Sequence, residues 1–202
     1  MVDLRILVLA SGNGSNFEAI HKACEEGRIK GRVVGILTNY AYAGVITKAI
    51  AYNIPCGFVS GVHESPAHTL AATRSFIPNL IALAGYNRIV PPATVDHFHG
   101  VLWEGVPGII NIHPADTQEY QGLYGHEFAL GLLPGTKRLT ETKITVHFVD
   151  HGVDTGPIIA QEVVPIDEDD TLDTLRCKGL KVEHELYPRC IEAYRTMFGK
   201  EV

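Results

Sequence analysis

Short apolar runs recur along the first half of the chain, and they constrain the fold more than any other feature. Four of them, at residues 6–10, 32–38, 80–84 and 109–113, are rich in isoleucine, leucine and valine and only a few residues long, which is typical of strands buried on both faces of a sheet. Residues 56–59 are expected to form a further short strand, the third of five along the chain. Helical segments separate them, and this alternation predicts a parallel sheet joined by right-handed crossovers.

The pattern changes in the second half. Residues 143–149 alternate between the two faces of a strand, residues 158–164 form another strand, and the tight loop at 151–157 is expected to join them into a hairpin. Helices are expected at 126–133 and from Thr171 onward. The predicted fold is a Rossmann-like open α/β sheet, mostly parallel, with a C-terminal antiparallel hairpin and helices on both faces.

Size and composition fit one soluble domain, expected at residues 1–202, with no repeat or linker. A net charge of −6 argues against a nucleic-acid partner, and no apolar run is long enough for a membrane span. The amino terminus lacks a signal-peptide pattern, so a cytoplasmic location is expected. The four cysteines show no Cys-x-x-Cys spacing and are expected to be small core residues: Cys24, Cys56, Cys177 and Cys190.

The fifth predicted strand, at residues 109–113, carries an amide and an imidazole side chain near its carboxyl end. Side chains alternate along a strand, so Asn111 and His113 point the same way, and Pro114 ends the strand after them. The carboxyl ends of strands are where open α/β sheets bind ligands. Equally, the pair could simply cap the strand end. Asp154, in the tight loop before Thr155, has a similar alternative as the start of an Asx turn.

A glycine-rich turn follows the first strand, at residues 11–16. Its glycines permit positive φ, and the start of the next helix offers free N–H groups and a positive dipole end, which together suit an anion such as phosphate. The spacing is not that of a dinucleotide or ATP loop. The alternative is a plain turn in which Ser15 caps the helix. A third helix is expected to begin with Ser65 as its cap and Pro66 at its first position.

Five blocks of the sequence resemble glycinamide ribonucleotide formyltransferases, folate-dependent enzymes of purine synthesis. The Asn111-Ile112-His113-Pro114 and Asp154-Thr155-Gly156-Pro157 motifs also mark the wider formyltransferase family. The resemblance spans nearly the whole chain, in the family's order and spacing, and its blocks are residues 9–16, 83–89, 111–114, 146–157 and 183–188.

The resemblance implies that Asn111, His113 and Asp154 are the catalytic residues. In formyl transfer, an amine attacks the formyl carbon of 10-formyltetrahydrofolate, and an amide donor and a protonated imidazole can stabilise the oxyanion that develops. Asp154 would keep His113 protonated and help to move the amine's proton. His147 resembles a supporting family histidine with a lesser role.

The resemblance also implies binding residues. The phosphate of glycinamide ribonucleotide would lie on Gly14, Ser15 and Asn16, and Glu183 would contact its ribose. The folate is expected against two loops, at Tyr86, Asn87, Arg88, Ile89 and Val90 and at Val149, Asp150 and Val153. On this basis residues 1–100 would be the phosphate-binding half and 101–202 the catalytic and folate-binding half. No metal is expected, and the protein would be a monomer or a homodimer.

The segment at 115–122 departs from the family pattern, which has an apolar Leu-Leu-Pro there. Here it carries Asp116 and Glu119, which could raise the pKa of His113 or repel a phosphorylated substrate. Leu180 also stands where the family has lysine or glutamine, and Glu64-Ser65 where it often has an arginine near the folate tail. These departures keep two alternatives open, namely another small, nucleotide-linked amine as acceptor, or hydrolysis of the formyl folate.

Overall fold

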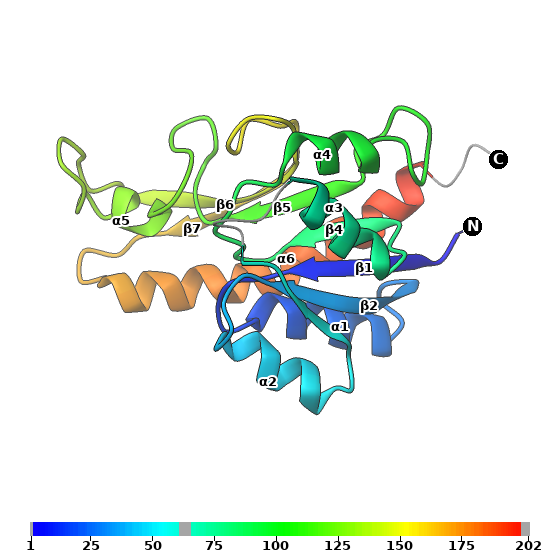
Figure 1. The fold of residues 1–202 in the computed structure, drawn as a ribbon. Coiled ribbons are helices and arrows are strands. Elements are labelled where there is room, and N and C mark those ends of the chain that lie inside the picture. The colour runs from blue at the N-terminus through cyan, green and yellow to red at the C-terminus, as the bar shows by residue number, and fades with distance from the viewer. Residues whose placement is uncertain (1, 61–65, 199–202) are drawn as a thin grey trace.

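A single mixed sheet forms the centre of the molecule. The computed structural model describes residues 2–60 and 66–198, and Figure 1 shows its ribbon. Within these residues the sheet has seven strands, in the order β3-β2-β1-β4-β5-β6-β7. Their bounds are β1 Leu4–Leu9, β2 Gly31–Thr38, β3 Cys56–Phe58, β4 Leu80–Leu83, β5 Ile109–His113, β6 Glu141–Phe148 and β7 Ile158–Pro165. The first five strands pair in parallel and the last two antiparallel, which confirms the predicted fold class.

Helices cover both faces of the sheet (Figure 1). They are α1 Ser15–Glu25, α2 Gly44–Ala51, α3 Pro66–Ser75, α4 Pro92–Phe98, α5 Gly125–Ala129 and α6 Leu172–Phe198. Alternate residues of β1 enter opposite cores: Ile6 and Val8 pack in the core that α1, α2 and α6 cover, and Leu7 and Leu9 in the one beneath α3 and α4. Burial on both faces explains why β1 is a continuous apolar run.

The strand order reverses between β1 and β4. The chain after β1 continues into α1 on one face of the sheet, and the chain after β4 continues into α4 on the other face. Ser11, after β1, donates its backbone N–H to Gly85, after β4, at 3.1 Å. The Ser11 hydroxyl also lies 2.9 Å from the Asn87 side-chain oxygen. The loops after β1 and β4 therefore meet at the switch point, where open α/β sheets bind their ligands.

Two local expectations need correction, and a third concerns a residue outside the described part of the chain. The helix expected at 126–133 ends at Ala129, because Gly131 adopts φ +68° and the Leu132 N–H bonds back to the Glu127 carbonyl. Ser65 lies outside the described residues. Two cysteines are not core residues: Cys56 begins an edge strand and Cys177 lies on α6, and both are exposed. All four cysteines are free thiols.

Within residues 2–60 and 66–198, no helix combines the length and the apolar character that crossing a membrane requires. The longest, α6, packs one side against the sheet through residues such as Leu175, Tyr187 and Ile191. Tyr187 is fully buried, and its hydroxyl donates to the Leu83 and Ile110 carbonyls at 2.9 and 3.0 Å. These two hydrogen bonds attach α6 to β4 and β5, the two strands that lead into the site.

Candidate active site

A cavity of about 450 Å³ opens at the carboxyl ends of β4 and β5. The loop after β4 forms one wall, and the loop between β6 and β7 forms the other. Twelve of the residues predicted from the sequence line it: Tyr86, Asn87, Arg88, Ile89, Val90, Asn111, His113, His147, Val149, Asp150, Val153 and Asp154. The predicted catalytic and folate-binding residues therefore share one cavity.

β5 and β6 place three of these side chains. Asn111 is paired with His147 across the antiparallel ladder, and His113 with Thr145 two positions further on. Residues two apart share a face, which puts the amide and both imidazoles on the cavity side. His113 and His147 are almost completely buried, with 4% and 2% of their surfaces exposed.

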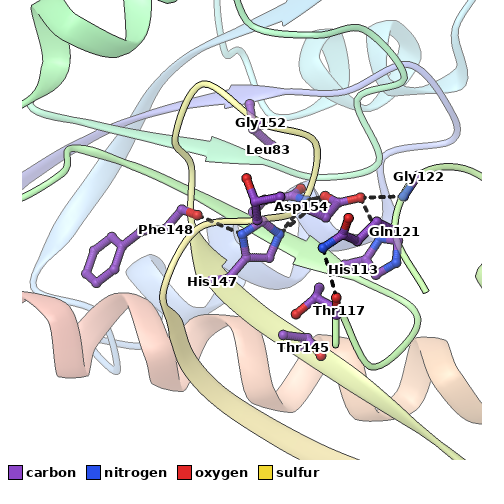
Figure 2. Close-up of polar contacts among 12 residues, drawn as sticks. Leu83, His113, Thr117, Gln121, Gly122, Thr145, His147, Phe148, Gly152 and Asp154 are labelled. Carbon is purple, nitrogen blue, oxygen red and sulfur yellow. Dashed lines mark hydrogen bonds and ion pairs between the residues drawn. The ribbon is translucent and has the colours of Figure 1, made fainter. Parts of the chain in front are cut away.

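The Asp154 carboxylate lies at the centre of the cluster (Figure 2). Its Oδ1 accepts a hydrogen bond from Asn111 Nδ2 at 3.1 Å, and its Oδ2 accepts one from the Gly122 backbone N–H at 2.8 Å. His113 Nδ1 lies 3.5 Å from Oδ2, and His147 Nε2 lies 3.4 Å from Oδ1. The backbone of Asp154 is left-handed, with φ +52°, so the loop is bent to turn this carboxylate into the cluster.

Asp150 performs the turn role that was the alternative for Asp154. Its Oδ1 accepts hydrogen bonds from the Gly152 N–H at 3.0 Å and from the Thr155 hydroxyl at 2.6 Å. This is the Asx-type bonding that stabilises a tight loop. Asp150 lines the cavity, but its carboxylate already holds the loop that carries Asp154.

His147 contacts the backbone through one ring nitrogen and the cluster through the other. Its Nδ1 lies 2.7 Å from the Phe148 carbonyl, which can only accept, so Nδ1 carries a proton. Its Nε2 lies 3.1 Å from Asn111 Nδ2 and 3.4 Å from Asp154 Oδ1. The Asn111 amide nitrogen therefore contacts both His147 and Asp154. His147 is therefore as closely tied to the cluster as the three predicted catalytic residues.

Charge is distributed unequally between Asp154 and His113. Burial alone would raise the pKa of Asp154, but its contacts with His147, His113 and the Gly122 N–H outweigh burial and lower it. Burial is also the largest influence on His113 and lowers its pKa, while Asp154 and the backbone of Tyr120 act in the opposite direction. Asp154 is thus ionised, and His113 is harder to protonate than a free histidine, contrary to the expectation of an imidazole held in its protonated form.

The acidic residues of the 115–122 segment do not act on His113 as expected. Asp116 is buried and faces Lys143, with its Oδ2 at 2.7 Å from Nζ, and Glu119 is exposed. The lysine compensates the charge of Asp116. Neither acid is among the groups that set the pKa of His113.

The predicted phosphate-binding residues form a second group, outside the residues that line the cavity. Gly14, not Ser15, is the N-cap of α1, with φ +73°, and a Cβ there would lie 2.6 Å from Val45 Cγ2. Asn16 Nδ2 donates to Glu183 Oε2 on α6, which links two predicted residues that are far apart in sequence. Burial raises the pKa of Glu183, against the effect of Asn16. Among the described residues, the buried Asn16 Oδ1 has no hydrogen-bond partner.

Several residues at the site were not predicted from the sequence. Gly122, Leu123 and Tyr124 line the cavity, and Thr145 lies directly opposite His113 on the neighbouring strand. The only signal for Gly122 was its retention in a segment that otherwise departs from the family pattern. In the part of the chain that the structure describes, no group of three or more His, Cys, Asp or Glu side chains could hold a metal ion.

Comparison with known proteins gives a consistent result. Residues 4–191 match the family model described as formyl transferase. A phosphoribosylglycinamide formyltransferase of Bacillus subtilis is 36% identical over 93% of each chain, and one of Escherichia coli is 33% identical over 93% of this chain and 85% of its own.

Solved structures agree with these sequence matches. A glycinamide ribonucleotide transformylase of Symbiobacterium toebii superposes with a TM-score of 0.86 at 33% identity, covering 96% of this chain and 89% of its own. A phosphoribosylglycinamide formyltransferase of Bacillus halodurans gives 0.84 at 32% identity, covering 95% of both. With its sheet, its Asn-x-His and Asp-x-Gly-Pro motifs and its cavity in place, this chain belongs to the formyl transferase family.

Proposed function

We propose that this protein transfers a formyl group from 10-formyltetrahydrofolate to the amine of glycinamide ribonucleotide, with Asn111, His113 and Asp154 as its catalytic residues. The observation that carries the proposal is the Asp154 carboxylate, bonded to Asn111 and paired with His113 inside a cavity. An amide, an imidazole and a carboxylate in contact can stabilise an oxyanion and move a proton, which is what transfer of a formyl group to an amine requires.

The reaction forms a bond from the amine nitrogen to the formyl carbon and breaks the bond from that carbon to folate N10. One proton must leave the amine, and one must reach N10. His113 Nε2 is sealed from solvent, so Nδ1, which faces Asp154, is the nitrogen available for this transfer. Burial lowers the pKa of His113 and the charge of Asp154 partly offsets it, so the ring can accept the proton beside the carboxylate and then return it to N10.

Asn111 supplies the neutral donor for the oxyanion. In the free protein its Nδ2 donates to Asp154 Oδ1 at 3.1 Å and lies 3.1 Å from His147 Nε2. One of these contacts must be released when the formyl oxygen arrives, and hydrogen bonds of catalytic groups often rearrange in this way when substrate binds. A single donor of this kind is worth about 3 kcal/mol of transition-state stabilisation.

Two binding regions support the choice of substrates. The turn at Gly14, Ser15 and Asn16, which opens α1, suits the phosphate, and Glu183 beside Asn16 suits the ribose hydroxyls. The folate pterin would lie between Tyr86–Val90 and the loop carrying Val149, Asp150 and Val153, on the apolar lining of the cavity. The two halves of the chain thus both contribute to the cavity, and the chemistry needs no metal.

A formyl-transfer assay tests the function. Purified protein is mixed with a 10-formyl deaza analogue of the folate, whose absorbance changes when the formyl group leaves. The reaction is run with glycinamide ribonucleotide, with unphosphorylated glycinamide riboside, and without an amine. We expect turnover only with the ribonucleotide and a formylated product of the corresponding mass. Loss of formyl without an amine would indicate a hydrolase, and no turnover with bound analogue would indicate a different acceptor.

A further inference from the structure

A partly buried ion pair joins the segment that departs from the family pattern to β6. Asp116 is 6% exposed, and its two carboxylate oxygens reach in different directions. Oδ2 accepts from Lys143 Nζ on β6 at 2.7 Å. Oδ1 accepts from Gln161 Nε2 on β7 and from the Gln118 backbone N–H, both at 3.0 Å. One side chain therefore connects both strands of the hairpin to the segment that follows β5.

Residues 116–122, called here the Asp116 turn, form a turn that begins at Asp116 and is closed by hydrogen bonds to its backbone. The Asp116 carbonyl accepts from the backbone N–H groups of Glu119 and Tyr120, at 3.0 and 2.8 Å. Gln121 Nε2 closes the turn with a bond of 3.1 Å to the Thr117 carbonyl, drawn in Figure 2. The turn is thus fixed internally, and the bonds of the Asp116 carboxylate to Lys143 and Gln161 attach it to the hairpin.

The far end of the Asp116 turn meets the catalytic cluster. Gly122, with φ +89°, donates its N–H to Asp154 Oδ2 at 2.8 Å (Figure 2). This is a shorter contact to the carboxylate than those made by Asn111 or His113. The backbone of Tyr120, two residues earlier, lies against His113. A shift of the turn would therefore move groups that touch both members of the proton-transferring pair.

Ala115, the residue before the turn, is also hydrogen-bonded to the hairpin. The Thr145 hydroxyl, which is fully buried, donates to the Ala115 carbonyl at 2.7 Å, and Gln161 Nε2 donates to that hydroxyl at 2.9 Å. Because Thr145 is paired with His113 in the ladder, this bond connects the start of the turn to the strand position directly opposite His113. An apolar side chain at 116 would fill the space, but it would supply none of these directional bonds.

We propose that Asp116 is a positioning residue for formyl transfer, whose ion pair with Lys143 and bond to Gln161 hold the Asp116 turn so that the Gly122 N–H stays on the Asp154 carboxylate. The inference rests on the proposed function for its effect on turnover. The positioning itself can be measured without it, as exchange of the Gly122 amide hydrogen with solvent.

Three variants and a matched control test this. Asp116→Asn keeps the shape but removes the charge, Lys143→Met removes the partner, and Lys143→Arg restores a cation. The control is Lys178→Met, which removes the partner of Asp170, and of the more exposed Asp167, elsewhere on the molecule. The side chains of that pair are 31% and 5% exposed, against 34% and 7% for Lys143 and Asp116.

We expect Asp116→Asn and Lys143→Met to lower kcat by about 10- to 100-fold, with the KM for glycinamide ribonucleotide and the Kd for the folate analogue unchanged within about threefold. Exchange of the Gly122 amide should accelerate by a similar factor. Lys143→Arg should recover most of both effects, and Lys178→Met should change neither, even if it lowers the melting temperature equally.

The proposal fails if Gly122 exchange is unchanged in Asp116→Asn, or if Lys143→Arg behaves like Lys143→Met. It also fails if only the KM changes, since the pair would then act on substrate binding. If the unaltered protein transfers no formyl group, the proposed function fails, and the exchange rates alone decide whether Asp116 positions the turn.

Discussion

His126 makes the stability of this protein sensitive to acid. Its ring is 9% exposed beside α6, and within the described part of the chain its Nε2 has no hydrogen-bond partner. Burial, with a contribution from the charge of Arg176, lowers the pKa of His126 from its ordinary 6.5 to about 4. The folded protein therefore binds this proton less readily than the unfolded chain does.

The sign and size of the effect follow from this difference. Above pH 6.5 the ring is neutral in both states and His126 costs nothing, whereas below it only the unfolded chain gains the proton. The free energy of unfolding consequently falls as the pH approaches 4. Each pKa unit corresponds to about 1.4 kcal/mol, so the loss at pH 5 should be about 2 kcal/mol.

Urea denaturation of the unaltered protein and of His126→Asn measures this loss. Between pH 7.5 and pH 5, we expect the free energy of unfolding of the unaltered protein to fall by about 2 kcal/mol more than that of the variant. Other groups titrate in the same range, and the comparison removes their shared contribution. An equal loss in the two proteins would refute the reasoning, because the buried ring would then not be the source.

Two further predictions concern the substrate sites. Ser15→Asp places a carboxylate at the positive end of α1 and should raise the KM for glycinamide ribonucleotide about 10-fold in steady-state assays, with Ser15→Ala as the uncharged control. An unchanged KM would mean that the phosphate lies elsewhere. Gly156→Ala would put a Cβ 1.9 Å from the Phe148 carbonyl oxygen, so the loop that carries Asp154 must move. We expect kcat/KM to fall at least about 100-fold in a protein that remains folded by circular dichroism, and full activity would show that the loop tolerates the displacement.

Much of the fold could be predicted because its determinants are local. Apolar runs and the helices between them locate the strands, and alternation along β5 places Asn111 beside His113. The end of α5 could not be placed, because Gly131 leaves the helix where a Cβ would lie 2.5 Å from the Arg138 backbone nitrogen. That contact depends on how the following segment returns, which the helical pattern does not contain.

The candidate site was predictable in its members but not in its electrostatics. Sequence motifs located Asp154, whereas its central place depends on a left-handed backbone and on the Gly122 N–H from another loop. The pKa of His113 depends on burial, and burial is a property of the packed protein. Asp116 looked like an unpaired acid because its partner, Lys143, is 27 residues away in sequence.

The central claim is that the Asp154 cluster carries formyl transfer to glycinamide ribonucleotide, and single-turnover kinetics of Asp154→Asn test it most directly. The variant keeps the shape of the side chain but removes the charge that faces His113 at 3.5 Å. We predict that the unaltered protein transfers formyl to the ribonucleotide and that the variant does so about 1,000-fold more slowly, a loss of about 4 kcal/mol, while the Kd for the folate analogue changes less than about threefold. A transfer rate within a few-fold of the unaltered protein would contradict the account.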